Sequence, residues 1–380
     1  MALEANRHIL LVANTLWSVY NFRYGVIRSL IENGYKVTVV GPHDQYVQQL
    51  TEMGCNIELI NLSPQGKNPF KDLCLIYELI SIYKKLKPDF IFHYTIKLNI
   101  YGSIAAKLTN SKSIAITTGL GFVFNQDTIL TKFISLLYSL AFRYSKEVWF
   151  LNNDDKAIFI KKNILKEDKA FILESEGVDT EYFAPAIKEN SSVELTSGVT
   201  FLLIARMLWE KGVGEYVEAA RRIKEKYADV RFQLLGACDS ENPGAISSQE
   251  ISNWHREGII EYLGVTKDIR PFITNADCVV LPSFYREGVP RVLMEAASMA
   301  KPIITTDNVG CKDVIIDGQT GFLCKSRDAN DLVKVMLEFI AAPQVDKLRM
   351  GDCGRELMKE KFDEKIIIDI YHRTLDKYLS

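Results

Sequence analysis

The sequence lacks several features that would place it in a specialised class of protein. It has no run of about 18 apolar residues, and residues 1–14 contain neither a long apolar region nor a small-residue cleavage site, so we expect no membrane span and no standard secretory signal. The seven cysteines are widely separated, odd in number and without zinc-like spacing, which predicts free thiols in a reducing cytoplasm. The formal net charge is −2 with no block of like charge, so nucleic-acid binding is not expected.

Short β-branched runs alternate with helix-length amphipathic stretches, which is the pattern of βαβ units around a parallel sheet. The alternation occurs twice along the chain. The first series of predicted strands is 8–14, 36–42, 56–61, 89–94, 112–118 and 148–152, and the second is 199–205, 230–236, 259–264, 278–283 and 302–306. The predicted fold class is therefore α/β, with two Rossmann-like, doubly wound domains that face a central cleft. Ligands of such domains bind at the carboxyl ends of the strands.

The segment between the two series has the composition of an interdomain linker. Residues 184–198, APAIKENSSVELTSG, are polar and show no hydrophobic period. With 380 residues, the chain is long enough for two domains of ordinary size. We therefore place one domain at residues 1–183 and the other at residues 199–363.

Two glutamates flank a Gly-Val-Pro turn in the sequence SFYREGVPRVLMEAASMAKP, residues 283–302. Glu287 is predicted to lie in the loop after a strand, and Glu295 at the flank of the buried face of a helix that begins at Pro290, half buried but within reach of the cleft. A carboxylate can hold two neighbouring hydroxyls, so the pair suits a ligand with two diols, such as a nucleotide sugar. Alternatively, Glu287 favours the helix dipole and Glu295 is a solvated helix residue. A glycosidase-like acid/base pair ranks lower, because this fold does not favour it.

Two cations follow the strand predicted at residues 199–205. Arg206 and Lys211 lie in the sequence RMLWEKG, and Gly212 leads into the next helix. A departing nucleoside diphosphate leaves negative charge, which a metal or fixed cations must neutralise. The chain contains no Asp-X-Asp triplet, the usual ligand in metal-dependent sugar transfer, so the hypothesis is that these cations bind the diphosphate without a metal. The alternative is two solvated surface cations.

The sequence ARMLWEKG, followed later in the chain by EGVPRVLMEA, resembles the retaining glycosyltransferases of family 4, which have the GT-B architecture. The resemblance covers essentially the full length, with further matches in SEGVDTEYF (175–183), LPSFYREG and GQTGFL (318–323). TGLGFVF (118–124) and HYTIKLNIYG (93–102) look most like enzymes that extend polyprenyl-diphosphate-linked sugars in bacterial glycan assembly, including N-acetylgalactosaminyltransferases that add the second sugar of an N-glycan. The resemblance also implies that a final helix at residues 364–380 packs back on the first domain.

The resemblance implies roles for matched residues of the second domain. Arg206 and Lys211 would bind the diphosphate of the donor, and Glu287 would hold the hydroxyls of the donor sugar together with the backbone N–H groups of Gly288 and Val289. It also implies retention of the anomeric configuration and no metal or other cofactor. The departing phosphate would then accept the proton of the acceptor hydroxyl, because no obvious general base is present.

The resemblance extends to the nucleoside and includes two departures. Glu295 would hold the ribose, and Val265 would meet the base. Ala205 stands where many relatives have glycine, and a methyl group should be tolerated there. Near Thr117 and Thr118 the chain lacks a histidine that several relatives place beside the donor sugar, so that role is unassigned.

The N-terminal half is expected to bind the acceptor. Asn21 is a plausible helix N-cap, with Arg23 in the first turn, which is a place able to hold a phosphate. Gly119 and Gly121 in the sequence TTGLG permit positive φ and close approach of the backbone. The stretch is not a dinucleotide fingerprint, because the third glycine is missing and it follows a later strand.

Two further residues are weak candidates for the acceptor site. His93 and Lys97 are predicted to follow the fourth strand, where they could add charge near an acceptor diphosphate. A satisfied structural histidine is an equal alternative for His93, whereas the position of Lys97 at a strand end favours function.

Residues 128–145, TILTKFISLLYSLAFRYS, form the most apolar helical stretch. They are too short and too charged to span a bilayer comfortably. A helix buried against the sheet is the preferred interpretation. The functional alternative is an interfacial helix that seats the protein on the cytoplasmic leaflet, where a lipid-borne acceptor would lie.

The sequence therefore predicts an enzyme that transfers a sugar, an N-acetylhexosamine or hexose, from a UDP-sugar to a polyprenyl-diphosphate-linked saccharide in bacterial surface-glycan assembly. It would work in the cytoplasm, bound peripherally to the inner face of the cytoplasmic membrane. Two other functions stay open: a UDP-sugar 2-epimerase of the same two-domain architecture, and a non-catalytic protein that binds sugar nucleotides.

Overall fold

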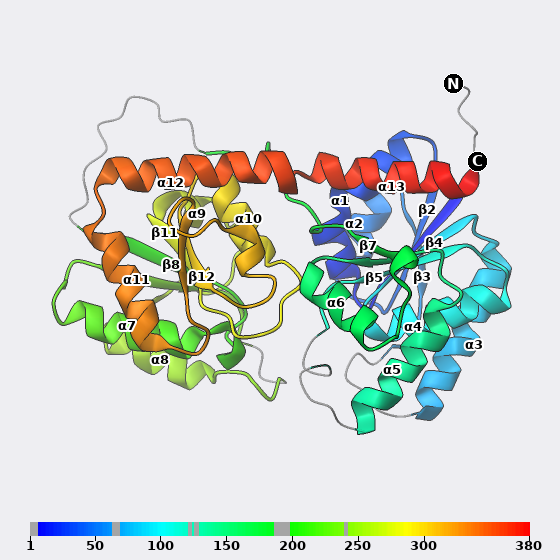
Figure 1. The fold of residues 1–380 in the computed structure, drawn as a ribbon, viewed down its shortest axis with the longest axis horizontal. Helices are drawn as coiled ribbons and strands as arrows, with labels where there is room; N and C mark the ends of the chain where they lie inside the picture. Colours follow the sequence, from blue (N-terminus) through cyan, green and yellow to red (C-terminus); the bar gives the residue numbers. More distant parts are fainter. Residues whose placement is uncertain (1–6, 63–68, 121–123, 125–128, 186–197, 239–241) are drawn as a thin grey trace. The chain divides into compact units, whose positions relative to one another are not determined.

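The computed structural model describes residues 7–62, 69–120, 124, 129–185, 198–238 and 242–380. The chain forms two compact units: unit 1 is Met1–Gly177 together with Glu364–Ser380, and unit 2 is Val178–Asp363. Each unit is a parallel sheet with helices on both faces (Figure 1). The predicted α/β class with two doubly wound domains is confirmed.

Unit 1 is built on a seven-stranded sheet in the order β3-β2-β1-β4-β5-β6-β7. Its strands are β1 (His8–Val12), β2 (Lys36–Gly41), β3 (Asn56–Leu59), β4 (Phe90–Tyr94), β5 (Ser113–Thr117), β6 (Val148–Phe150) and β7 (Ala170–Ile172). Its helices are α1 (Leu16–Glu32), α2 (Val47–Glu52), α3 (Pro69–Leu86), α4 (Ile96–Leu108), α5 (Ile129–Phe142), α6 (Asn153–Lys161) and α13 (Glu364–Leu379), with a short 3-10 turn at Glu167–Lys169.

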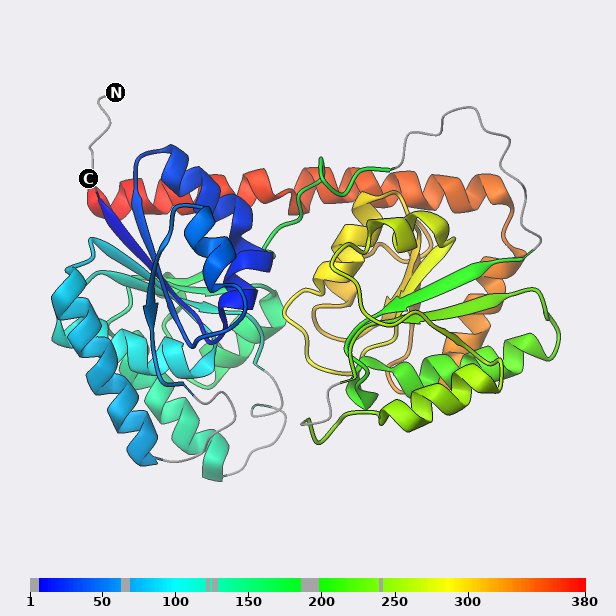
Figure 2. The same cartoon turned by 180° about the vertical axis from the view of Figure 1, so that it is seen from behind.

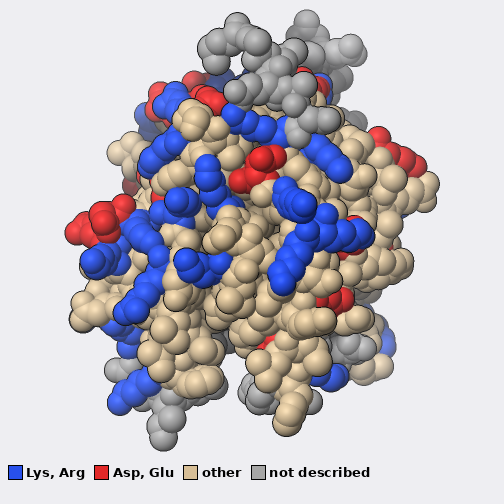
Figure 3. Space-filling view, turned by 90° about the vertical axis from the view of Figure 1, so that its right-hand side faces the viewer, with Lys and Arg blue, Asp and Glu red and all other residues tan. Residues whose placement is uncertain are grey.

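Helices cover both faces of this sheet, which explains why β1, β4 and β5 are apolar runs buried at every position. Helices α1, α2 and α13 lie on one face, and α3, α4 and α5 lie side by side on the other (Figures 1 and 2). On the face of unit 1 that Figure 3 shows, Lys and Arg prevail over Asp and Glu. The strand order reverses between β1 and β4, and such a reversal opens a crevice at the carboxyl ends of the two strands.

Unit 2 is built on a six-stranded sheet in the order β10-β9-β8-β11-β12-β13. Its strands are β8 (Thr200–Ile204), β9 (Arg231–Leu235), β10 (Glu261–Tyr262), β11 (Cys278–Leu281), β12 (Ile303–Thr306) and β13 (Gly321–Cys324). Its helices are α7 (Val213–Lys224), α8 (Ser248–Arg256), α9 (Arg270–Asn275), α10 (Arg291–Ser298), α11 (Ala329–Ala341) and α12 (Gln344–Leu357), with 3-10 turns at Trp209–Lys211 and Lys312–Val314 and a π turn at Met358–Phe362.

The two faces of the unit 2 sheet have separate cores. Helices α7, α8 and α11 pack on one face, around Phe201 and Phe232. Helices α9 and α10 pack on the other, around Leu202 and Leu293. The strand order reverses between β8 and β11, so the crevice of unit 2 lies where the loops after these two strands meet.

The first domain ends earlier than the sequence predicted. Residues 178–183 belong to unit 2 rather than to unit 1. The backbone N–H of Val178 donates to the carbonyl of Phe362 at 2.9 Å, and the hydroxyl of Ser298 donates to the carbonyl of Phe183 at 2.7 Å. These long-range bonds attach the segment to the helices of unit 2, which no local pattern could indicate. Most of the expected linker, residues 186–197, lies outside the described residues.

Two strands were missed and one was overestimated. The sequence analysis did not predict β7 or β13, which have three and four residues and are too short to show a reliable period. The strand predicted at 259–264 narrows to Glu261–Tyr262, because β10 is an edge strand that pairs only with β9. Helix α13 packs against α1 within unit 1.

Replacing Gly102 with alanine should destabilise unit 1, because α4 crosses β4 so closely that an added Cβ would lie 2.4 Å from Cδ2 of His93. The expected loss is about 1–3 kcal/mol in the free energy of unfolding, measured by urea denaturation. Gly354→Ala in α12 is the matched control. Its Cβ would meet its nearest neighbour at 3.6 Å, so alanine should be neutral or stabilising by up to about 1 kcal/mol. Equal effects of the two substitutions would contradict this packing.

Candidate functional site

Two loops of unit 2 are joined through their main chains at the carboxyl ends of β8 and β11. The carbonyl of Glu210 accepts hydrogen bonds from the backbone N–H groups of Phe284 and Tyr285, each at 3.0 Å. It also accepts one from the hydroxyl of Ser283 at 3.2 Å. The loop that carries Lys211 is therefore fixed against the loop that carries Glu287.

Gly212 makes this close approach possible. Its φ is +76°, in the left-handed region, and an added Cβ would lie 2.0 Å from the carbonyl oxygen of Pro282. Neither the conformation nor the space suits another residue. Gly212 ends the 3-10 turn at Trp209–Lys211 and begins α7, which fixes the position of Lys211.

Lys211 and Glu287 form an ion pair in this crevice. The ammonium of Lys211 donates to Oε1 of Glu287, and the two side chains are only 17% and 12% exposed. The hydroxyl of Ser283 donates to the same carboxylate oxygen at 2.9 Å. The structure thus brings together two residues that the sequence analysis assigned to one site. It also shows a contact that the sequence did not predict, since Lys211 was expected to face a diphosphate alone.

Together with Arg206 and Glu210, this pair forms a cluster of four charged side chains. Arg206 follows β8 and its side chain is exposed. Burial raises the pKa of the Glu210 carboxyl, and the nearby charges of Lys211 and Arg206 act to lower it. The cluster has two cations and two carboxylates. A diphosphate bound here would add negative charge beside Glu287, so its oxygens would have to point to the two cations.

The end of β12 and the loop after it hold the Glu287 loop in place through hydrogen bonds. The side-chain amide of Asn308 donates to the carbonyl of Tyr285 at 2.6 Å, and the hydroxyl of Thr306 donates to the carbonyl of Ser283 at 2.6 Å. An added Cβ at Gly310 would lie 2.5 Å from the carbonyl oxygen of Gly288. The sequence analysis did not select these supporting residues. Their only sequence signal is that they follow a strand next to β11.

Helix α10 begins directly after this loop. Gly288 and Val289 precede its N-cap, Pro290, and no side chain makes a capping hydrogen bond there. The first N–H groups of a helix carry partial positive charge and donate hydrogen bonds to anionic or hydroxyl oxygens. In α10 these groups belong to residues after Pro290, so Gly288 and Val289, which the sequence analysis selected, precede them in the chain.

Glu295 is more buried than predicted. It lies on α10 at 9% exposure rather than half buried, and its Oε1 accepts a hydrogen bond from Nε of Arg291 at 2.9 Å. Burial raises the pKa of this carboxyl, and the charge of Arg291 opposes the rise. Glu295 is buried more deeply than expected because α10 packs closely on the sheet, where Leu293 and Ala296 are fully buried. The carboxylate of Glu295 is therefore oriented by Arg291, and only a small part of the residue is exposed.

Val265 lies beyond the end of β10 and is 70% exposed. The loop before it is fixed by the backbone N–H of Gly236, which donates to the carbonyl of Gly264 at 2.8 Å. The hydroxyl of Tyr262 donates to the carbonyl of Gly236 at 2.9 Å. Val265 therefore offers an uncovered apolar surface from a well-anchored loop.

In unit 1, the prediction for Asn21 was wrong. Helix α1 begins at Leu16, and the side chain of Thr15 caps it by accepting from the backbone N–H of Ser18 at 3.2 Å. Asn21 lies inside the helix and donates from its amide to the carbonyl of Trp17 at 2.9 Å. Thr15 lies three residues after the end of β1 in extended conformation, so it takes the capping position six residues before Asn21.

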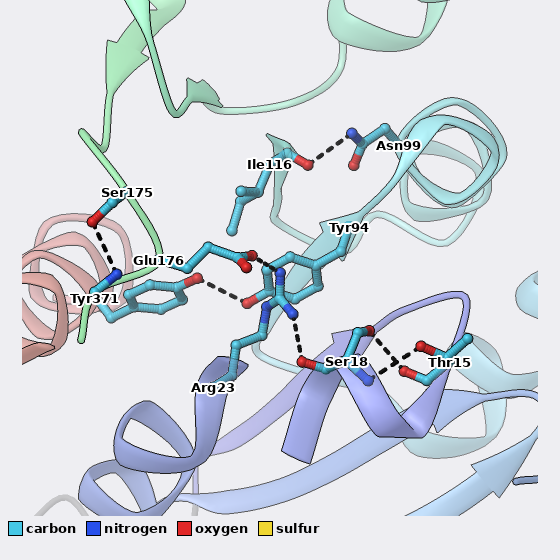
Figure 4. A network of polar contacts seen from close by, with 10 residues as sticks. Thr15, Ser18, Arg23, Tyr94, Asn99, Ile116, Ser175, Glu176 and Tyr371 are labelled. Atoms are coloured by element: carbon cyan, nitrogen blue, oxygen red, sulfur yellow. Dashed lines mark hydrogen bonds and ion pairs between the residues drawn. The ribbon is translucent and has the colours of Figure 1, made fainter. Parts of the chain in front are cut away.

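Arg23 is not at a helix N-terminus and does not face solvent. It lies where α1 departs from helical geometry, and it is 4% exposed. Its guanidinium pairs with Glu176, donates to the carbonyl of Ser18 at 2.9 Å and stacks 3.8 Å above the ring of Tyr94 (Figure 4). Tyr94 in turn bonds the hydroxyl of Tyr371 on α13 at 2.9 Å. Arg23 therefore joins α1, β4 and α13 rather than forming the predicted phosphate site.

His93 is a structural residue. It lies within β4, not after it, and is fully buried. Its Nε2 bonds the hydroxyl of Tyr83 at 2.9 Å, and burial lowers its pKa to about 3. A neutral imidazole packed under α4 cannot add positive charge near an acceptor, so the functional alternative for His93 is wrong.

Lys97 lies in the first turn of α4, and its ammonium is 2.9 Å from Oδ1 of Asp72 on α3. It lines a pocket of about 620 Å³ at the carboxyl ends of β2 and β3, together with His43, Asn61 and Lys71. Lys97 thus lies where an acceptor could bind, although the structure pairs it with a carboxylate.

The two glycines of the TTGLG stretch have different outcomes. Gly119 has a φ of +132°, as expected for a residue that must permit positive φ. Gly121 lies outside the described residues. Among the described residues, no group of three or more His, Cys, Asp or Glu side chains is suited to holding a metal ion.

The buried state of His93 predicts a pH dependence of stability. Because its folded pKa is about 3 and its unfolded pKa is near 6.5, its contribution is complete above pH 6.5 and falls as the pH decreases below that value. At about pH 5 the loss should be about 2 kcal/mol relative to neutral pH. Burial also lowers the pKa values of His8 and His372, so urea denaturation at both pH values should show a loss that is larger by about 2 kcal/mol in the parent chain than in His93→Gln. An equal pH dependence in both would contradict the assignment.

Comparisons with known proteins agree with the two-unit architecture. The family model described as "Glycosyl transferase 4-like" matches residues 8–152, and the model described as "Glycosyl transferases group 1" matches residues 198–342. These ranges fall in unit 1 and unit 2. The structure is also similar to the crystal structure of a glycosyltransferase from Rickettsia africae, with a TM-score of 0.78, 21% identity and 99% coverage of both chains.

Two curated relatives are similar over most of their length. The N,N'-diacetylbacillosaminyl-diphospho-undecaprenol alpha-1,3-N-acetylgalactosaminyltransferase of Campylobacter jejuni is 32% identical over 96% of this chain and 96% of its own. The UDP-Gal:alpha-D-GlcNAc-diphosphoundecaprenol alpha-1,3-galactosyltransferase of Escherichia coli is 28% identical over 76% of this chain and 75% of its own. With two Rossmann-like units, each matched by a glycosyltransferase model, and this full-length relative, the chain belongs to the family 4 glycosyltransferases of GT-B architecture.

Proposed function

We propose that this glycosyltransferase moves an N-acetylhexosamine or hexose from a UDP-sugar to a polyprenyl-diphosphate-linked saccharide, with retention and without a metal. The observation that carries the proposal is the ion pair of Lys211 and Glu287 at the crevice of unit 2, next to the uncapped start of α10. A fixed cation and a hydroxyl-binding carboxylate in contact suit a ligand that joins a diphosphate to a sugar.

The choice of donor and acceptor rests on the relatives together with the site. The Escherichia coli relative is named for UDP-galactose, and both relatives are named for undecaprenol-linked acceptors. The predicted ribose ligand, Glu295, and the predicted base contact, Val265, belong to unit 2 like the ion pair. The proposal therefore assigns UDP-sugar to unit 2 and the acceptor to unit 1.

The proposed reaction breaks the bond between the anomeric carbon of the sugar and the β-phosphate oxygen. The electron pair of that bond stays on the phosphate, and Lys211 and Arg206 stabilise the added charge. Glu287 holds the sugar hydroxyls so that one face of the anomeric carbon is presented. The acceptor hydroxyl forms the new bond on the same face and gives its proton to the departing phosphate oxygen, which leaves UDP and the extended lipid-linked saccharide.

The pocket in unit 1 is the proposed place for the acceptor saccharide. It is lined by polar groups of several kinds, including the amide of Asn61, the ammonium of Lys97 and the carboxylates of Asp72 and Glu78. Such groups suit sugar hydroxyls, which both donate and accept hydrogen bonds. Because the proposed acceptor carries a long lipid, we also propose that the enzyme works at the inner face of the cytoplasmic membrane.

Replacing Lys211 with alanine should lower turnover by roughly a hundredfold, because a pre-placed charge donor is lost. The measurement is UDP release with a short-chain lipid-linked acceptor. Lys334→Ala, at an exposed position on α11, is the matched control and should keep normal turnover. Near-normal turnover of the Lys211 variant would refute the role of this residue.

The chemistry itself has a separate test. Turnover should be unchanged by a chelator and should require the acceptor, and the product should keep the anomeric configuration of the donor. Epimer formation from the UDP-sugar alone would indicate the 2-epimerase instead, and binding without UDP release under any acceptor would indicate a non-catalytic protein. A loss of turnover that added Mg²⁺ restores would overturn the metal-free mechanism.

A further inference from the structure

Two helices of unit 1 carry large apolar side chains that are mostly exposed. On α3, Phe70, Leu73 and Tyr77 are 79%, 63% and 76% exposed. They recur at a spacing of three and four residues, so they share one side of the helix. Leu75 and Leu79 of the same helix are buried in the core, so the exposed stripe is a second apolar face and not an extension of the core.

Helix α5 has the same organisation. The sequence analysis preferred a buried helix here, and Tyr138, Ala141 and Phe142 are indeed buried against the sheet. The opposite side nevertheless exposes large apolar side chains, Phe133 and Leu136, each at 57%. Leu140 at 43% and Tyr144 at 46% continue this stripe. Helix α5 therefore has one side buried, as the preferred interpretation expected, and a second apolar side that is exposed.

The two stripes belong to one layer. Helix α4 packs against α3 on one side and against α5 on the other, on the same face of the sheet (Figures 1 and 2). The exposed end of α4 adds Leu108, which is 61% exposed. We call the exposed apolar residues of α3, α4 and α5 the apolar layer; its members are Phe70, Leu73, Tyr77, Leu108, Phe133, Leu136, Leu140 and Tyr144.

The helices that carry the apolar layer are rich in lysine. Helices α3, α4 and α5 contain six lysines and two acidic residues. Both acidic residues, Asp72 and Glu78, line the pocket rather than the apolar layer. The exposed cations of these helices and of the turn after α5 are Lys71, Lys84, Lys85, Lys107, Lys132 and Arg143.

This combination decides between a second copy of the chain and a lipid surface. Two copies joined through the apolar layer would bring Lys107, Lys132 and Arg143 of one against the same cations of the other, which is unfavourable once solvent is excluded. An anionic bilayer accepts apolar side chains at its acyl boundary and pairs lysine and arginine with phosphate headgroups. Among the described residues no helix is long and apolar enough to cross a membrane, so contact would be at the surface.

We propose that the apolar layer of α3, α4 and α5 is a docking surface for an anionic membrane, with two helices lying in the interface and the flanking cations on headgroup phosphates. The proposal rests on the proposed function only in its choice of the cytoplasmic leaflet. It goes further in naming the surface and in requiring α3 as well as α5. Because α3 also lines the pocket with Asp72 and Glu78, docking would hold that pocket beside the lipid surface.

The test is binding to vesicles of phosphatidylglycerol and phosphatidylcholine, measured by co-sedimentation without donor or acceptor. The parent chain should bind the anionic vesicles and not vesicles of phosphatidylcholine alone. The pairs Leu73→Asp/Tyr77→Asp on α3 and Phe133→Asp/Leu136→Asp on α5 should each weaken binding at least about tenfold. The matched control is Val345→Asp/Leu348→Asp on α12, where both residues are exposed at 70% and 50%, and it should bind like the parent.

Two further measurements keep the outcomes distinct. Thermal unfolding should be unchanged in all three variants, because the substituted side chains are exposed. Transfer to a short-chain acceptor in solution should also be unchanged, whereas transfer to a long-chain acceptor in vesicles should fall. No vesicle binding by the parent, or binding equal in all variants, would overturn the proposal, as would a dimer in sedimentation velocity that the variants dissociate. A failure of transfer chemistry alone would leave the vesicle result intact and would refute only the proposed function.

Discussion

The contact between Lys211 and Glu287 is the interaction on which the candidate site depends. The two residues are distant in sequence and meet because β8 and β11 are neighbours at the point where the strand order reverses. Each is mostly desolvated, and removing either would leave the other as a buried charge without its partner. The ion pair therefore requires that the two loops keep a fixed arrangement. The backbone hydrogen bonds to the carbonyl of Glu210 hold them in it. A donor that enters the site meets charges that are already placed.

The two units use the same architecture for different purposes at their points of strand reversal. In unit 2 the crevice holds the exposed Arg206 and the carboxylate of Glu287. In unit 1 the corresponding place is filled by Arg23, which is buried between Tyr94 and Glu176 and which links α1 to α13 through Tyr371 (Figure 4). The buried cation is paired with an acid and stacked on an aromatic face, so it stabilises the attachment of the last helix. The open pocket of unit 1 lies instead at the ends of β2 and β3.

Helix α3 of unit 1 has three sides with different surroundings. One side packs in the core, one side lines the pocket through Asp72 and Glu78, and one side exposes Phe70 and Tyr77. A helix with three distinct sides can hold a polar head and an apolar tail of the same amphiphile near each other. This is the geometric requirement of an enzyme whose acceptor would be a sugar attached to a lipid, and it does not depend on which sugar is transferred.

The sequence by itself determined the fold class and indicated the charged residues that meet in the crevice of unit 2. The tertiary structure decided which polar side chains are exposed and which are buried with a partner. The alternation of buried runs and amphipathic helices is a local property of the sequence, and it indicated two parallel sheets. Because the loops after parallel strands meet at one edge of a sheet, Arg206, Lys211 and Glu287 could be selected from the sequence. His93 and Arg23 could not be assigned in the same way. Burial and partners such as Glu176 come from segments far away in the chain, and they decide whether a cation binds a ligand or holds the fold together.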